Sequence, residues 1–461
     1  MKKLILIASV IVILFSSCDR SGRGQLIGVS GRPDWHYPDP YGMVYVPMGS
    51  YTMGPSDQDV AYSHNAISRT VSIAAFYMDE TEITNNEYRQ FVYWVRDSIA
   101  RLKLSEINEE FLISQDEYGE DIEPPLLNWK TKIRWDGQEE REQLSELYLP
   151  EHERFFRRRE VDSRKLIYRY QIVDLPRAAA RGQRSYWEHK TEDINATGTN
   201  SGYTGGNVSI PRADLVKTYA TPVYPDTLSW IHDFTYSYNE PMTQMYFWHP
   251  TYDHYPVVGV NWWQARAFTI WRTQLLNSYL GGMGEAFAMD FRLPTESEWE
   301  WAARGGLDLN PYPWGGPYTR NIDGCFLANF KPLRGNYIDD GGFQTVVVGH
   351  FPANDYGLYD MSGNVSEWTR NAWDESTYFY GHDLNMDYLL PLDAELDPQT
   401  PMTLKRKVVR GGSWKDVGFF LQVSSRTYEY MDTAKSYIGF RCVQTYPGRA
   451  RGDGNRASNV Y

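Results

Sequence analysis

Residues 408–426, VVRGGSWKDVGFFLQVSSR, have the composition of a loop at a reaction site. The features that set the loop apart are Arg410, Gly411, Gly412, Ser413, Trp414 and Asp416. The stretch contains no cysteine and no histidine, and its only acid is Asp416. Adjacent glycines favour a tight backbone turn. We therefore predict a compact loop in which Arg410 and Trp414 fix neighbouring loops by hydrogen bonding and stacking.

The N-terminus has the features of a lipoprotein signal. Lys2 and Lys3 precede a run of about twelve mostly apolar residues, which is shorter than the roughly 20 that span a bilayer. Cys18 follows two serines, so we expect residues 1–17 to be a signal peptide and Cys18 to be lipidated. A plain signal peptide with an incidental cysteine is the alternative. Residues 18–40 predict a flexible tether, and residues 446–461 predict a disordered tail.

Composition limits the class of protein. The 461 residues are 42% hydrophobic and 23% charged, which allows a large core. The formal charge of −13 argues against nucleic-acid binding, because phosphate binding needs clustered Lys and Arg. Besides Cys18, the chain has only Cys325 and Cys442, which can pair in an oxidising compartment but cannot form a disulfide framework.

Local patterns predict three helices with capping boxes and two short strands. The expected helix starts are Thr84 with Glu87, Asn261 with Gln264, and Thr295 with Glu298. The second helix has the apolar stripe Ala265, Phe268, Trp271 and Leu275. Residues 42–54 favour two strands joined by a turn. Residues from about 97 to 250 are densely charged and are interpreted as a long insertion with a charged surface.

Eight segments together resemble the formylglycine-generating enzyme (sulfatase-modifying factor) family. In family order they are MVYVPMGSYTMG, ETEITNNEYRQF, PVVGVNWWQA, RLPTESEWEWAARGG, YPWG, NDYGLYDMSGNVSEW, RGGSW and GFRCV, within residues 43–95 and 256–443. The resemblance implies one irregular α+β domain over residues 41–445, related to C-type lectins. That domain would have little regular secondary structure and would carry the insertion at about 97–250.

A narrower resemblance is to a lipoprotein subfamily of the gliding-motility and type IX secretion machinery, called GldK or PorK. It is carried by Cys18, by PYGMVYVPMGSYTMGP and by FYMDETEITNNEYRQFVYWVRDSI, followed by the insertion. It implies an outer-membrane lipid anchor with the domain facing the periplasm. It also implies a large homo-oligomeric ring, built with a periplasmic partner of the GldN or PorN type and other secretion components.

In the enzymes of this family, the loop after RGGS carries two cysteines that bind copper and oxidise a substrate cysteine. Copper(I) requires soft sulfur ligands. The first cysteine corresponds to Asp416 and the second falls around Leu421, and no cysteine lies between Arg410 and Phe440. The resemblance therefore implies a pseudoenzyme that has no catalytic residues and binds no copper.

Family members also bind calcium through segments that mix carboxylates with backbone carbonyls. The resemblance maps a first site to Asp360, Gly363, Val365 and Glu367, where Gly363 and Val365 would offer carbonyls. It maps a second site to Asn329, Phe330 and Asp340. Calcium would be structural at these positions. The alternative is that Asp360 and Glu367 only cap loops.

Two other functions stay open. A residual oxidase-type enzyme would use Asp416 or the Ser424–Ser425 pair, although no histidine in the loop is available to activate a serine. A lectin-like module that binds glycan or peptidoglycan is suggested by the fold class and by the many Trp and Tyr residues.

Overall fold

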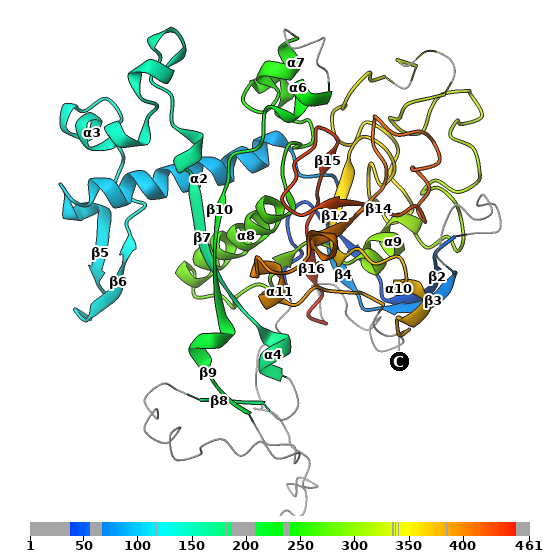
Figure 1. The fold of residues 1–461 in the computed structure, drawn as a ribbon, viewed down its shortest axis with the longest axis horizontal. Coiled ribbons are helices and arrows are strands. Elements are labelled where there is room, and N and C mark those ends of the chain that lie inside the picture. The colour runs from blue at the N-terminus through cyan, green and yellow to red at the C-terminus, as the bar shows by residue number, and fades with distance from the viewer. Residues whose placement is uncertain are drawn as a thin grey trace, which may run out of the picture. The chain divides into compact units, whose positions relative to one another are not determined.

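The computed structural model describes residues 37–55, 67–116, 118–179, 183–186, 208–233, 240–333, 336, 338–339, 341–383 and 386–448. Residues 40–446 form one compact unit, which contains all the helices and strands labelled in Figure 1. Cys18 and Asp340 lie outside the described residues. Helices and short strands mix along the chain, in agreement with the expected α+β class. Among the described helices, none has both the length and the apolar character needed to cross a membrane.

The three predicted helix starts are confirmed. They begin α2 (Asn85–Leu104), α8 (Trp262–Gly282) and α9 (Glu296–Arg304), each with both hydrogen bonds of a capping box. Helix α9 ends at Gly305, whose φ of 60° is left-handed. This conformation is the common C-terminal stop for which glycine is suited.

The main core lies between α2 and α8. The ring of Tyr88 stacks on that of Phe268 with centroids 5.6 Å apart, and Phe91 meets Phe268 edge-on at 5.9 Å. The predicted stripe of α8 is confirmed as far as Trp271, whereas Leu275 is exposed. The prediction failed there because the last part of α8 extends beyond the core.

Two four-stranded sheets bring distant segments together. The first has the order β1 (Met43–Val46), β4 (Phe76–Asp79), β16 (Val443–Thr445) and β11 (Phe291–Arg292), and all its pairs are antiparallel. The second has the order β14 (Thr427–Tyr430), β13 (Arg406–Arg410), β12 (Ser366–Ala372) and β15 (Ile438–Gly439). Only the β12–β15 pair of this sheet is parallel. Strand β13 ends at Arg410, so this sheet positions the start of the loop.

The two strands predicted within residues 42–54 form, but they do not pair with each other. β1 pairs with β4, and β2 (Gly49–Met53) pairs with β3 (Arg69–Ile73) in a separate sheet. Pro47 lies between β1 and β2 and has no N–H to donate to a ladder. The two strands are therefore predicted correctly from local residues, while their pairing partners come from distant segments.

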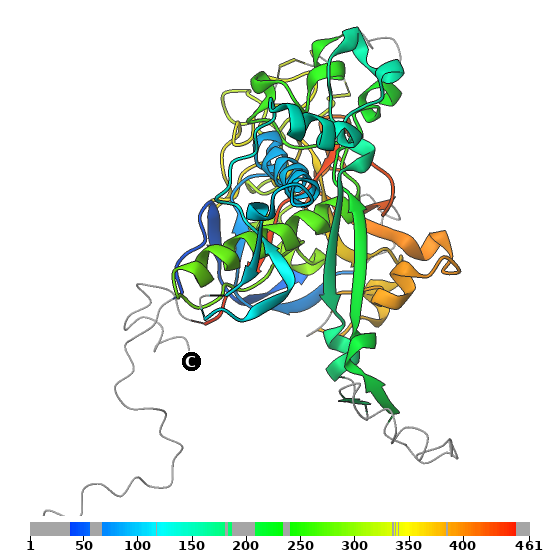
Figure 2. The same ribbon diagram turned by 90° about the vertical axis from the view of Figure 1, so that its left-hand side faces the viewer.

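Beside this core lie a hairpin and a long ribbon. The hairpin is β5 (Leu112–Gln115) with β6 (Asp121–Leu127), and the ribbon is β7 (Ile167–Val173) with β10 (Val216–Pro222). A short parallel pair, β8 (Gln183–Tyr186) and β9 (Val208–Pro211), follows the ribbon. Figures 1 and 2 show the ribbon passing alongside α8. Its buried face stacks Tyr170 on Tyr219, with centroids 5.4 Å apart.

Candidate functional site

The buried side chain of Arg410 stabilises the loop of residues 408–426, called the candidate loop below. Its Nη1 donates hydrogen bonds to the carbonyls of Ser424 and Ser425 at 3.0 Å each, and its Nη2 donates to the carbonyl of Val423 at 2.7 Å. Nη2 also pairs with the buried carboxylate of Glu300 on α9. Arg410, the last residue of β13, thus holds residues 423–425 at the end of the loop by hydrogen bonds, as predicted.

The two glycines after Arg410 are required by their surroundings. Gly411 has a φ of 94°, and a Cβ added there would lie 3.2 Å from the ring of Trp299. Gly412 has a φ of 66°, and its added Cβ would lie 2.7 Å from the carbonyl oxygen of Phe420. Both positions combine a left-handed backbone with close packing, so a larger residue would be strained at either.

Trp414 connects the loop to a second apolar cluster. Its Nε1 donates to the carbonyl of Ser436 at 3.3 Å, and its ring stacks on Trp230 with centroids 6.0 Å apart and planes 9° apart. Tyr246 and Val365 belong to the same buried cluster. The stacking predicted for Trp414 is therefore confirmed. These rings are buried, so they offer no open platform for a sugar.

The family resemblance maps the two copper-binding cysteines to Asp416 and to about Leu421, and both of these residues make structural contacts. Asp416 accepts a hydrogen bond from Ser413 Oγ at 2.6 Å, and burial raises the pKa of its carboxyl. Leu421 is fully buried in an apolar cluster with Tyr312, Ala328 and Phe330. At the mapped positions the structure therefore has an acid hydrogen-bonded to a serine and a leucine packed in an apolar cluster.

Both cysteines of the described chain have free thiols in this structure. Cys325 is exposed, whereas Cys442 is buried, and they do not pair with each other. The backbone N–H of Cys442 donates to the Asp79 carboxylate at 2.9 Å, and burial raises the pKa of the thiol well above its usual range. Neither sulfur belongs to the candidate loop.

The serines of the loop are engaged with backbone groups or with an acid. Ser425 Oγ donates to the carbonyl of Phe419 at 2.8 Å, and Ser424 is buried. Ser413 Oγ donates to Asp416. Within the described part of the chain, no basic nitrogen accepts a proton from these hydroxyls, which an activated serine nucleophile would need. The observed bonds stabilise the loop.

The first predicted calcium segment is tightly packed against its surroundings. Both oxygens of Glu367 accept hydrogen bonds from the Arg441 guanidinium, at distances down to 2.6 Å, and Trp299 Nε1 donates to Oε2 at 2.8 Å. Gly363 has a φ of 88°, and a Cβ there would lie 2.5 Å from the carbonyl oxygen of Asn329. Arg441 therefore already neutralises Glu367, a contact that the sequence analysis missed.

Asp360 and Glu82 carry the unsatisfied oxygens near this segment. Asp360 Oδ2 accepts from the N–H of Gly349 at 2.6 Å, and Glu82 Oε2 accepts from Asn364 Nδ2 at 3.3 Å. Their other oxygens, Asp360 Oδ1 and Glu82 Oε1, are buried without a hydrogen-bond partner among the described residues. Burial raises the pKa of Asp360 to about 6, and burial together with the Asp360 carboxylate raises that of Glu82 well above its usual range. The sequence analysis did not single out Glu82.

The second predicted calcium segment is only partly described. Asn329 Nδ2 donates to the carbonyl of Gln344 at 2.6 Å, and the carbonyl of Asn329 accepts from the N–H of Asn364 at 2.9 Å. Phe330 packs in the Leu421 cluster, and Asp340 lies outside the described residues. Across the described ranges, no three His, Cys, Asp or Glu side chains are grouped to hold a metal ion. That absence does not bear on the two predicted calcium sites, because each combines only one or two carboxylates with backbone or side-chain carbonyl groups. Both calcium sites therefore stay a prediction.

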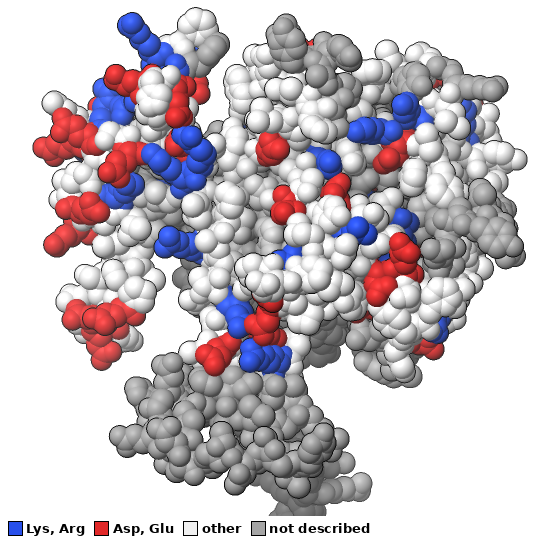
Figure 3. Space-filling model, viewed as in Figure 1, with Lys and Arg blue, Asp and Glu red and all other residues white. Residues whose placement is uncertain are grey.

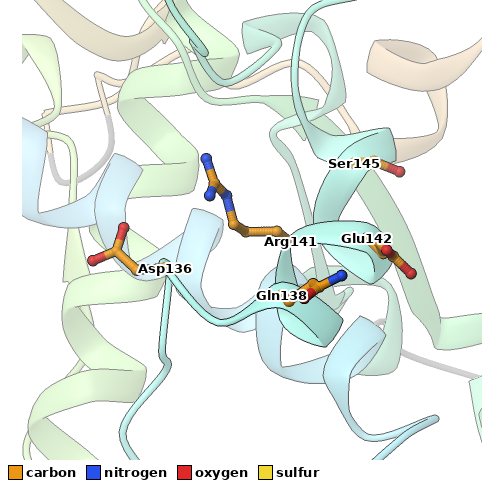
Figure 4. Close-up of a pocket in the computed structure, with 5 residues that line it drawn as sticks. All are labelled: Asp136, Gln138, Arg141, Glu142 and Ser145. Atoms are coloured by element: carbon orange, nitrogen blue, oxygen red, sulfur yellow. The ribbon is translucent and has the colours of Figure 1, made fainter.

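A shallow cavity lies at a different place, beside α3 (Gln138–Gln143). It has a volume of about 490 Å³ and is lined by Asp136, Gln138, Arg141, Glu142 and Ser145. Figure 4 shows that these side chains do not converge on one point, since Arg141 and Glu142 extend in different directions. The cavity does not have the geometry of a ligand site.

Comparison with known proteins identifies the family. The sequence model of the family described as "Sulfatase-modifying factor enzyme 1-like domain" matches residues 35–150 and 173–446. The match includes most of residues 97–250, so the expectation of one long insertion there is not confirmed. Only residues 151–172 fall between the matched segments.

Individual relatives match over shorter lengths. The chain is 33% identical over 195 residues to the inactive C-alpha-formylglycine-generating enzyme 2 of Bos taurus. This alignment covers 41% of this chain and 50% of the relative. It is 32% identical over 194 residues to the formylglycine-generating enzyme of Thermomonospora curvata, covering 41% and 55%. The chain thus spans about half the length of these curated relatives.

Among solved structures, PvdO from Pseudomonas aeruginosa aligns with a TM-score of 0.43 and 16% identity, over 90% of this chain and 99% of that chain.

The family match itself extends over well more than half of the sequence. The protein therefore belongs to the family defined by the sulfatase-modifying factor enzyme 1-like domain.

Proposed function

We propose that the protein is a non-catalytic structural lipoprotein of the type IX secretion and gliding-motility machinery, of the GldK or PorK kind. In this proposal Cys18 anchors it in the outer membrane and the domain faces the periplasm. There it forms a ring with a periplasmic partner of the GldN or PorN type. The anchor, the partner and the ring are supported by the lipoprotein signal and the subfamily resemblance.

The observation that carries the non-catalytic assignment is the filling of the two thiol positions. Leucine offers no lone pair to a metal, and the oxygens of Asp416 are hard donors that suit copper(I) poorly. Leu421 is also packed in an apolar cluster, so it is not a vacant ligand position. A family member whose name describes it as inactive gives further support.

We also propose a structural calcium ion at Asp360. The residues present fit a hard cation, because Asp360 Oδ1 and Glu82 Oε1 are buried oxygens without hydrogen-bond partners among the described residues. Arg441 is hydrogen-bonded to Glu367, and its charge also acts on Glu82 and Asp360. A divalent cation would balance the charge of Glu82 and Asp360 when both are ionised. Bound calcium would hold together loops that lack regular ladders.

The test of the structural role uses the native chain. It is extracted from envelopes in mild detergent, sized, and imaged with whatever co-purifies. A large annular particle that contains a second protein is expected, and the Cys18→Ala variant should leave the membrane fraction. A lone small species would overturn the ring, and binding of that species to purified cell wall would favour the glycan-binding alternative.

The non-catalytic assignment has a separate test. The full chain is incubated with copper(I) and a cysteine-containing substrate peptide, and bound copper and peptide aldehyde are measured. We expect neither to exceed the background of a chain-free sample. Stoichiometric copper, or aldehyde formed in repeated turnovers, would contradict the assignment.

A further inference from the structure

We infer that two oppositely charged surfaces of this chain bind each other between copies, so that copies join head to tail. The inference rests on the ring proposed above and names the contact within it. The first surface is the acidic hairpin, residues 112–127. The second is the arginine loop, residues 154–165.

The acidic hairpin carries a one-sided charge. Residues 104–129 contain eight acids and no Lys or Arg. Within β5, β6 and their turn, the exposed acids are Asp116, Glu120, Asp121 and Glu123. Apolar side chains accompany them, since Tyr118 is 89% exposed and Leu126 is 55% exposed. Acids grouped around exposed apolar side chains are typical of a surface that binds a basic protein partner.

The arginine loop has the complementary charge. Residues 154–165 contain six basic and two acidic residues. Arg164 is paired with Asp162 at 2.8 Å, whereas Arg157 and Arg158 are exposed and form no ion pair within the described residues. Phe156 beside them is 80% exposed. The loop therefore also presents an aromatic side chain among cations.

The backbone of the arginine loop is held in an uncommon conformation. Phe156 has a φ of 47° and Arg157 a φ of 55°, and both values are left-handed. Consecutive left-handed residues other than glycine cost free energy, and such strain is concentrated at functional sites. Here the strained residues are Phe156, whose ring is exposed, and Arg157, whose guanidinium has no ion pair among the described residues.

The two surfaces lie at opposite ends of the same side of the unit. In Figure 1 the hairpin of β5 and β6 lies below α2, and the teal segment that contains the arginine loop lies above it. Figure 3 shows acidic side chains without basic ones at the lower left of this face, and basic side chains interspersed with acidic ones at the upper left. Two surfaces so placed cannot meet within one copy, but they can meet when one copy is stacked on the next.

A second copy of the chain is the partner that this arrangement fits. The complement of each surface is present on the chain itself, in a contact that would join two unlike surfaces. Such heterologous contacts generate rings when the rotation closes. The contact should weaken with salt, because the Debye length falls from about 10 Å at 0.1 M to about 3 Å at 1 M.

Charge reversal tests the contact on the full-length lipidated chain in detergent. The hairpin variant is E120K/E123K, and the loop variant is R157E/R158E. Asp116 is left intact because its Oδ1 accepts from the N–H groups of Tyr118 and Glu120 at 2.8 Å and so shapes the turn. K132E/R134E is the matched control, since it reverses two exposed charges outside both surfaces. Mass distributions are measured at low and high salt.

We expect the wild-type chain and the control to associate at low salt and to dissociate at high salt. Each reversal alone should weaken self-association at least tenfold. A 1:1 mixture of the two variants should associate again, because the reversed hairpin of one fits the reversed loop of the other. The chain that carries all four substitutions should also associate with itself.

Three results would overturn the inference: a wild-type chain that is monomeric at every salt concentration, reversals without effect, or no recovery in the mixture. Loss of a different co-purifying protein, with self-association intact, would overturn it as well, since the surfaces would then serve that protein. If both variants still form the native annular particle, the contact is wrong and the proposed function stands. If wild-type envelopes yield no such particle, the proposed function itself fails.

Discussion

The loop from Arg410 to Arg426 and the charged segment from 104 to 165 use ionic side chains in opposite ways. In the loop, Arg410 is buried against Glu300, and Arg426 donates to Glu296 at 2.9 Å. In the charged segment, Arg157 and Glu120 lie exposed. Buried charges are tolerated only when paired, so those of the loop serve its architecture. Exposed charges cost little and remain available to partners.

Arg410→Ala should cause the largest loss of unfolding free energy among the variants. A small loss would contradict the contrast between buried and exposed charges. Removing the guanidinium leaves three carbonyls without a donor and removes one cation from Glu300. Breaking a buried pair from one side costs about 3–5 kcal/mol. Arg158→Ala in the arginine loop is the control, expected to stay within about 0.5 kcal/mol. Urea denaturation measures the free energy of unfolding, and a loss below about 1 kcal/mol for Arg410→Ala would contradict the buried role.

Gly412→Ala sharpens the comparison by separating backbone strain from packing. Gly316→Ala is its matched control, because Gly316 has a φ of 80° but nothing within 4 Å of an added Cβ. The left-handed backbone alone costs about 1–2 kcal/mol. At Gly412 the contact with the carbonyl of Phe420 should add about 1–3 kcal/mol. Equal losses of unfolding free energy in the two variants would show that the loop can relax around a methyl group.

Calcium removal tests whether the buried acids near Asp360 also belong to the architecture. Protein purified without added calcium should contain metal, and a chelator should lower its melting temperature. At calcium concentrations ten times Kd, the loss corresponds to about 1.4 kcal/mol. Asp360→Asn should abolish the shift, whereas Asp355→Asn, at an exposed acid of the same segment, should keep it. No bound metal and an unchanged melting temperature would refute the site.

The pH dependence of Asp416→Asn should be the smallest effect. Burial raises the pKa of Asp416 in the folded protein. The resulting stabilisation is fully present below the unfolded pKa of about 3.9 and is lost as pH rises through the folded pKa. Relative to wild type, the variant should therefore gain unfolding free energy as pH rises from 3 to 8. A difference that stays constant with pH would show that this carboxyl does not experience burial.

Features set by neighbouring residues could be predicted from the sequence. The capping box of Thr84 and Glu87 needs only residues three positions apart, and it forms as expected. The tight glycine loop and the roles of Arg410 and Trp414 also followed from local composition together with the family resemblance.

Features set by distant residues could not be predicted. Glu82 lies near Asp360, and Arg441 is hydrogen-bonded to Glu367. Both contacts exist only because the fold brings together three separate parts of the chain. No periodicity or spacing signals such contacts. The pairing of β1 with β4 in place of β2 has the same origin, since strand partners depend on the completed sheet.

The pairing of β4 with β16 has a consequence for the time at which the protein can fold. Phe76 to Met78 pair with Val443 to Thr445, and Arg441 donates to the carbonyl of Asp79 at 3.2 Å. The first sheet therefore stays incomplete until almost the whole chain is available, and such long-range pairing slows folding. If the chain is exported through a membrane, as the proposed function requires, β4 and β11 lack their shared partner β16 until residues 443–445 have crossed. The final residues then complete the sheet on the far side.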